Sequence, residues 1–197
     1  MFRKLKTTVQ QYAAKYDVIA GVLSEQKQKI FTNVDWSSSK KDKEFAAAKE
    51  GFDLAHIELV KEYQAKVKAD IDSIRVDFKK TITNEVGANE IAELKLLMDW
   101  KLSEFELQAY GEKYQGNYKA LRLLKKIAEN NGFQFVFTSD EDILYDLGTL
   151  QSYCLSAISQ YEGKTAGHNN VRLIIHGAGI DMYEQNYNNF LNPFIAL

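Results

Sequence analysis

The stretch that decides the fold is KKDKEFAAAKEGFDLAHIELVKEYQAKVKADIDSIRVDFKKTIT, which runs from Lys40 to Thr83. Its apolar residues recur at steps of three and four, the spacing of one face of a helix. They are Phe45, Ala48, Phe52, Ala55, Leu59, Tyr63, Val67, Ile71, Ile74, Phe78 and Ile82. The mean step of about 3.7 is typical of a nearly straight helix seam, and no proline interrupts the stretch. It therefore predicts one continuous helix, roughly 66 Å long at about 1.5 Å per residue.

A second, narrower apolar stripe precedes this helix and predicts a partner for it. Its members are Phe2, Leu5, Val9, Tyr12, Tyr16, Ile19, Leu23 and Ile30. The segment TNVDWSSSKKDKEF, residues 32–45, then breaks the pattern, and Ser39 with Asp42 resembles a capping box. Two long helices joined by a short break predict an antiparallel, coiled-coil-like hairpin.

A third helix is expected to start near Asn89 and to stop at Asn131 and Gly132, a typical helix C-terminus. One face of it carries Ile91, Leu94, Met98, Leu102, Phe105 and Ala109, and the pattern resumes with Tyr118, Leu121, Leu124 and Ile127. Gly111 and Gly116 are possible kinks.

The pattern changes after Gly132. FQFVFTS, residues 133–139, and VRLIIHG, residues 171–177, are short runs that suggest strands. A helix capped by Ser139 and Asp142 lies between them. The predicted fold class is mainly α, with long antiparallel helices in a hairpin or bundle and a small C-terminal α+β cap. The predicted division is a long-helix region, 1–131, and a cap with an aromatic, Asn-rich tail, 132–197.

Composition excludes several classes of protein. The chain of 197 residues has a net charge of −2 and no dense stripe of Lys and Arg with interleaved aromatics, so no nucleic-acid partner is expected. From Lys40 to Lys80, ten basic residues nearly balance nine acidic ones, which gives little attraction to an anionic membrane. One cysteine excludes an internal disulfide, and the longest clean apolar run near the N-terminus, Val18 to Leu23, is too short for a signal or a membrane span. The expected location is a cytoplasm or a virion, neither secreted nor transmembrane.

The segment most like an enzyme is the loop after the second strand candidate, His176-Gly177-Ala178-Gly179. A hydrolase with such a loop also needs a serine in a G-x-S-x-G turn, and none occurs. A pair of Cys154 with His168 or His176 is left open, although Cys154 lies on an apolar stripe, where cysteine is usually a buried hydrophobe. The histidines have no metal-ligand spacing. We therefore predict no enzyme, and no catalytic, cofactor or metal site.

Protein–protein contact is the chemistry that these exclusions leave. We predict a non-enzymatic structural subunit of a multimeric assembly, bound to copies of itself, to a second structural protein, or to both; a homo-oligomer is expected. In composition the chain resembles virion and assembly proteins of tailed bacteriophages, which are short, rich in Lys, Asn and Tyr, and almost free of proline. The alternatives are a cytoplasmic coiled-coil adaptor or regulator and, third, an enzyme that uses the C-terminal cap.

The C-terminal tail is the predicted interface. Tyr183, Tyr187, Phe190 and Phe194 follow one another at gaps of four, three and four residues. The first three could share a face of a short helix before Pro193. The tail is expected to dock on another subunit; the competing interpretation is that it packs on its own chain.

Overall fold

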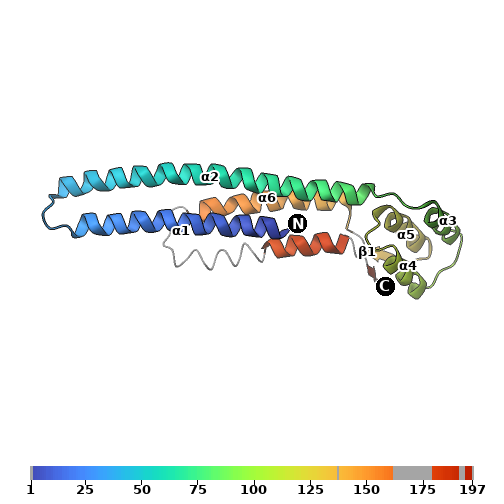
Figure 1. Ribbon diagram of the computed structural model, residues 1–197. Coiled ribbons are helices and arrows are strands. Elements are labelled where there is room, and N and C mark those ends of the chain that lie inside the picture. The colour runs from blue at the N-terminus through green and yellow to red at the C-terminus, as the bar shows by residue number, and fades with distance from the viewer. Residues whose placement is uncertain (1, 137, 162–178, 191–193, 197) are drawn as a thin grey trace. The chain divides into compact units, whose positions relative to one another are not determined.

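The computed structural model describes residues 2–136, 138–161, 179–190 and 194–196 (Figure 1). Its helices are α1 (Phe2–Thr32), α2 (Ser38–Thr83), α3 (Ala88–Leu97), α4 (Glu104–Lys113), α5 (Tyr118–Asn130) and α6 (Asp140–Tyr161). Residues 179–190 are also helical. The prediction of a mainly α protein with a helical bundle is confirmed.

The chain forms two compact units. Unit 1 comprises Met1–Ile71 and Gln151–Ile180, and unit 2 comprises Asp72–Leu150 and Asp181–Leu197. These limits differ from the predicted division after residue 131, which stays a prediction.

In unit 1, α1 and α2 run side by side as an antiparallel hairpin (Figure 1). Contacts that join the start of α1 to late positions of α2, and the end of α1 to early ones, define this direction: Thr8 bonds Asp70, and Phe31 packs on Phe45. The hairpin confirms the prediction from the two stripes. The helix predicted for Lys40–Thr83 is one continuous element of 46 residues.

The predicted cap of α2 is two residues off. The helix begins at Ser38, and the Ser37 hydroxyl accepts a hydrogen bond from Lys40 N at 3.3 Å, so Ser37 caps the helix rather than Ser39. Serines occupy positions 37, 38 and 39, and sequence alone did not distinguish among them.

The α2 seam is buried along only part of its length. Tyr63, Val67 and Ile71 are at most 2% exposed, whereas Phe52 and Ala55 are half-buried. In α1, Phe2, Leu5, Val9, Tyr12 and Tyr16 are buried, and the next buried residue is Ile30. The part of the hairpin nearest its turn therefore keeps apolar surface in contact with water.

In unit 2, the single third helix that the sequence predicted is three helices. Breaks at residues 98–103 and 114–117 separate α3, α4 and α5. The first cap is at Gly87, not Asn89, because the Glu90 carboxylate accepts a hydrogen bond from Gly87 N at 2.9 Å. At the far end the prediction is confirmed: α5 stops at Asn130 and Gly132 adopts a φ of 82°, which favours glycine. The three helices enclose one apolar cluster, which comprises Leu94, Leu97, Leu102, Leu107, Tyr114, Ala120, Leu121, Leu124, Ile127 and Ala128.

The predicted α+β cap is not supported. Among the described residues the only strands are β1 (Gln134–Val136) and β2 (Phe194–Ala196), three residues each, which pair antiparallel with Phe135 opposite Ile195. Residues 179–190 form a helix, the element that the spacing of Tyr183, Tyr187 and Phe190 allowed, and its residues Ile180, Tyr187 and Phe190 share one buried face. The second strand candidate, 171–177, lies outside the described residues.

Candidate interaction surface

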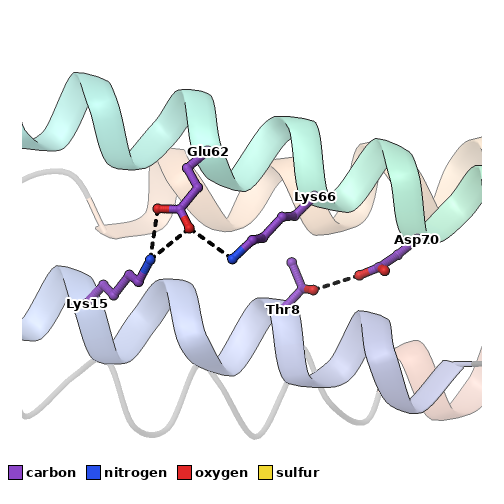
Figure 2. A network of polar contacts seen from close by, with 5 residues as sticks. All are labelled: Thr8, Lys15, Glu62, Lys66 and Asp70. Atoms are coloured by element: carbon purple, nitrogen blue, oxygen red, sulfur yellow. Dashed lines mark hydrogen bonds and ion pairs between the residues drawn. The ribbon is translucent and has the colours of Figure 1, made fainter.

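A network of polar side chains joins α1 to α2 in unit 1 (Figure 2). Lys15 Nζ donates to both carboxylate oxygens of Glu62 at 2.8 Å, and Lys66 Nζ donates to Glu62 Oε1 at 2.9 Å. Nearer the start of α1, the Thr8 hydroxyl donates to Asp70 Oδ2 at 2.6 Å. These contacts fix the register of the two helices.

The electrostatics of this network are those of a structural contact. Hydrogen bonds from Lys15 and Lys66 lower the pKa of Glu62 to about 2. Glu62 is therefore ionised at neutral pH and a weak base there, and both of its carboxylate oxygens accept hydrogen bonds from lysine.

His56 belongs to the aromatic packing between the same helices. Its Nε2 lies 3.3 Å from the Tyr12 hydroxyl, and its ring lies edge-on to Tyr16 and stacks on Phe52. Tyr12 also stacks on Tyr63, with ring centroids 4.4 Å apart. These contacts assign His56 to the helix–helix interface.

Cys154 is a buried thiol in α6. It is 0% exposed, and burial raises its pKa to about 12, with the Asp70 carboxylate as a smaller cause. A thiol with so high a pKa stays protonated and is a poor nucleophile. His168 and His176, the candidate partners of Cys154, lie outside the described residues, as does the loop through Ala178.

The part of the chain that the structure describes contains neither a group of candidate metal ligands nor a helix that could span a membrane. No group of three or more His, Cys, Asp or Glu side chains there is placed to hold a metal ion. None of the helices within the same residues has the length and apolarity needed to cross a membrane.

A different feature stands out in unit 2: four large apolar side chains exposed between residues 96 and 105. Leu96 is 61% exposed, Met98 39%, Trp100 59% and Phe105 82%. We call these four residues the α3–α4 surface. Trp100 and Phe105 line a groove of about 300 Å³ together with Leu102, Glu106, Ala109, Tyr110 and Lys113. Exposed apolar side chains beside a groove are typical of protein-interaction sites.

The break between α3 and α4 creates this surface. Ser103 caps α4 with reciprocal hydrogen bonds to Glu106, of which Ser103 N to Glu106 Oε2 measures 2.8 Å. Because the chain changes direction there, Met98 and Phe105 do not share the buried face that the sequence predicted for them. The sequence LLMDW, residues 96–100, indicated this exposure, because it places more large apolar residues side by side than one helical stripe accommodates.

The four tail residues predicted as an interface are in different environments. Tyr187 and Phe190 are 5% and 0% exposed, and both contact Phe78 of unit 2. Tyr183 is partly exposed, and Phe194 is in β2, without a described side chain. Two of the four side chains are therefore packed within their own unit, and docking of the tail on another subunit stays a prediction.

The comparisons with known proteins identify no relative: no protein family, no curated protein and no solved structure matches the chain.

Proposed function

We propose that the protein is a non-enzymatic structural subunit of a multimeric protein assembly. The observation that carries this proposal is the α3–α4 surface, where Trp100 is 59% and Phe105 is 82% exposed beside a groove. An aromatic side chain buries about 150–250 Å² when it is covered. These two residues alone therefore offer roughly 300 Å² of apolar contact, the size of patch that is often functional.

The surroundings of the groove suit a protein partner. Glu106 and Lys113 stand at its margin, so an apolar centre has charged neighbours. Lys113 also bonds Glu93 at 2.6 Å and lies over the Tyr110 ring, which holds this margin in place. An aromatic centre with a polar rim is the usual composition of a protein–protein interface, and tryptophan is prominent among its energetically dominant residues.

A tailed-bacteriophage particle is the setting that we propose for the assembly. Its support is compositional: a single proline in 197 residues, with 11 Tyr and 11 Phe. We propose Tyr183 and Phe194 as contacts of the tail in that assembly, whereas Tyr187 and Phe190 pack on Phe78 of their own unit.

The experiment that tests the function is quantitative mass spectrometry of purified particles and of their assembly intermediates. A structural subunit is present in a fixed number of copies per particle, and that is the expected result. If the chain is abundant in infected cells but absent from particles and intermediates, the proposal is overturned.

Two variants then test the α3–α4 surface. The double variant Trp100→Ser with Phe105→Ser should reduce incorporation into particles at least tenfold while helicity by circular dichroism is unchanged. Tyr145→Ser is the matched control, because Tyr145 is an aromatic residue of unit 2 that is 75% exposed and lies outside the groove. Equal incorporation of both variants would show that the α3–α4 surface does not contribute to assembly.

The second candidate is a coiled-coil adaptor or regulator, favoured by the α1–α2 hairpin. An adaptor would be recovered in stoichiometric complexes with a soluble protein in cells that contain no particle, which separates it from the first proposal.

A further inference from the structure

A groove runs along one face of the hairpin in unit 1, and α1 and α2 both line it at every level. Three adjoining hollows form it, of about 350, 270 and 370 Å³. The first begins at Lys15 and Glu62, and the last ends at Ile30 and Glu44, near the turn that joins the helices. We call the three hollows together the hairpin groove.

The two helices contribute side chains of different size to the hairpin groove. On α1, Val18 is 66% and Val22 is 51% exposed. On α2, Ala55 lines the same hollow as Val18, and Gly51 lines the same hollow as Val22. At Gly51 an added Cβ would meet no atom within 4 Å, so a side chain from outside can approach the backbone there. The groove therefore has protruding valines along one helix and small residues along the other.

Charge in the hairpin groove is divided between the helices in the same way. The charged residues that line it from α1 are both lysines, Lys15 and Lys29, and those that line it from α2 are all glutamates, Glu44, Glu58 and Glu62. Within the described part of the chain, only Lys15 and Glu62 of these five take part in an ion pair. Lys29, Glu44 and Glu58 are therefore available to a partner.

We propose that the hairpin groove is covered by the hairpin groove of a second copy, with the two hairpins parallel and their turns at the same end. The two copies are then related by a two-fold axis along the hairpin, which places α1 of each copy over α2 of the other. Two helices from each copy form a four-helix bundle. The inference rests on the proposed function and deepens it by naming the face through which the chain associates with itself.

Side-chain size favours this arrangement. Because Val22 and Gly51 line one hollow, they lie at the same level of the hairpin, and the two-fold axis brings Val22 of each copy against Gly51 of the other. In the neighbouring hollow Val18 meets Ala55 in the same way. A protruding row on one helix thus enters a shallow row on the next, which is how packed helices fit together.

Charge favours the same arrangement. Lys29 and Glu44 line one hollow, so Lys29 of each copy meets Glu44 of the other. Lys15 and Glu58 line the hollow farthest from the turn, and they meet across the pair as well. The two-fold axis repeats both contacts, so four pairs of opposite charge enclose an apolar centre. Such complementary charges fix the register and direction of an interface.

An antiparallel pair of the same grooves is disfavoured by these charges. It would place α1 over α1 and α2 over α2, with the turn of one hairpin at the far end of the other. Lys29 would then face Lys15 of the second copy, and Glu44 would face Glu58. Like charges placed together oppose association.

Other lysines near the turn do not oppose the parallel pair at the groove. Lys27 Nζ lies 5.8 Å from the centre of the Phe45 ring, and Lys41 Nζ donates to the Phe31 carbonyl at 3.2 Å. Neither lysine lines the groove. At this end the paired surfaces therefore bring together one lysine and one glutamate from each copy.

Sedimentation equilibrium of the full chain tests the surface with a matched pair of variants. Val22→Glu places a charge at the centre of the groove, and Val76→Glu places the same charge at a valine of equal exposure, 51%, outside it. The wild type and Val76→Glu should dimerise alike, and Val22→Glu should dimerise at least tenfold more weakly while circular dichroism shows both variants folded. Equal dimerisation of the two variants, or a wild type that is monomeric at every concentration, would overturn the inference.

Charge reversal tests the direction of pairing. Lys29→Glu and Glu44→Lys should each weaken the dimer several-fold, because like charges then meet at positions 29 and 44 of the two copies. An equimolar mixture of the two variants should recover wild-type affinity, because both of these contacts in the mixed dimer then join opposite charges. Changes within one chain cannot produce that recovery.

Two outcomes of the charge reversal reject the parallel pair. A tighter dimer of Lys29→Glu would show the antiparallel direction, in which the new glutamate faces Lys15. A mixture that dimerises no better than its components would show that Lys29 and Glu44 do not meet. Presence in or absence from purified particles judges the proposed function independently of these results.

Discussion

Replacing Phe190 by alanine tests whether the C-terminal helix, residues 179–190, is part of the folded core or a free docking element. Phe190 is 0% exposed, and its ring lies 5.0 Å from the ring centroids of both Phe78 and Tyr118. Emptying a buried phenylalanine site costs about 3–5 kcal/mol. For a chain of this length each kcal/mol lowers the melting temperature by about 2–4 °C, so we expect a decrease of roughly 6–20 °C.

Two further variants separate the causes of that loss. Phe190→Leu keeps most of the apolar volume and removes two aromatic pairs worth about 0.5–1.5 kcal/mol each, so its cost should be about 1–3 kcal/mol. Met182→Ala is the control on the same helix, because Met182 is 53% exposed and a surface change costs within about 0.5 kcal/mol.

Urea unfolding followed by circular dichroism measures these free energies, and sedimentation equilibrium measures self-association in parallel. If Phe190→Ala unfolds at the wild-type urea concentration but no longer self-associates, Phe190 docks on another subunit and the intramolecular packing argued above is refuted.

Three other predictions address unit 1. Glu62 has its pKa lowered from 4.5 to about 2, so its ionised form is favoured in the folded state; that stabilisation is complete above the ordinary pKa and is lost as the pH falls towards 2. The difference in unfolding free energy between the wild type and Glu62→Gln should therefore shrink between about pH 6 and pH 2, and a difference that is constant with pH would contradict the ion-pair network. Ile71→Ala should lower the free energy of unfolding in urea by about 2–5 kcal/mol, because Ile71 is 0% exposed. Phe52→Ala should lower it by less in a monomeric sample, because Phe52 is only half-buried. Equal losses for the two variants would show that the α2 seam is buried throughout. The Cys154 thiol should not react with a disulfide reagent at pH 8 until urea unfolds the protein, since burial raises its pKa to about 12; rapid labelling of the native protein would show that the thiol is accessible.

Local features of the sequence were sufficient to predict the long helix α2, the start of α6 and the end of α5. A stripe at steps of three and four without proline specifies a helix from interactions within one turn or two, and α2 follows it from Ser38 to Thr83. The cap at Ser139 is local in the same sense, because Asp142 N bonds the Ser139 hydroxyl at 3.1 Å across three residues. The stop at Gly132 needs only a residue that tolerates positive φ.

The candidate interaction surface was not predictable in this way. The sequence marked Phe105 as part of a buried stripe, yet it is 82% exposed, because the Ser103 cap ends that stripe and starts a new helix in another direction. The choice between a continued helix and a capped break depends on which arrangement packs Leu94, Leu107 and Leu124 into one cluster. That choice is a property of three helices together.

Periodicity identifies a helix face that must be covered, and only the tertiary structure decides what covers it. The apolar residues of the α2 stripe have the same helical spacing around Phe52 and around Val67, but Val67 is 0% exposed and Phe52 is half-buried. Likewise, strand-like composition marked residues 133–139, but the partner of Phe135 is Ile195, about 60 residues along the chain. A local pattern fixes backbone conformation through short-range hydrogen bonds and sterics, whereas burial and strand pairing depend on contacts between segments that the pattern does not connect.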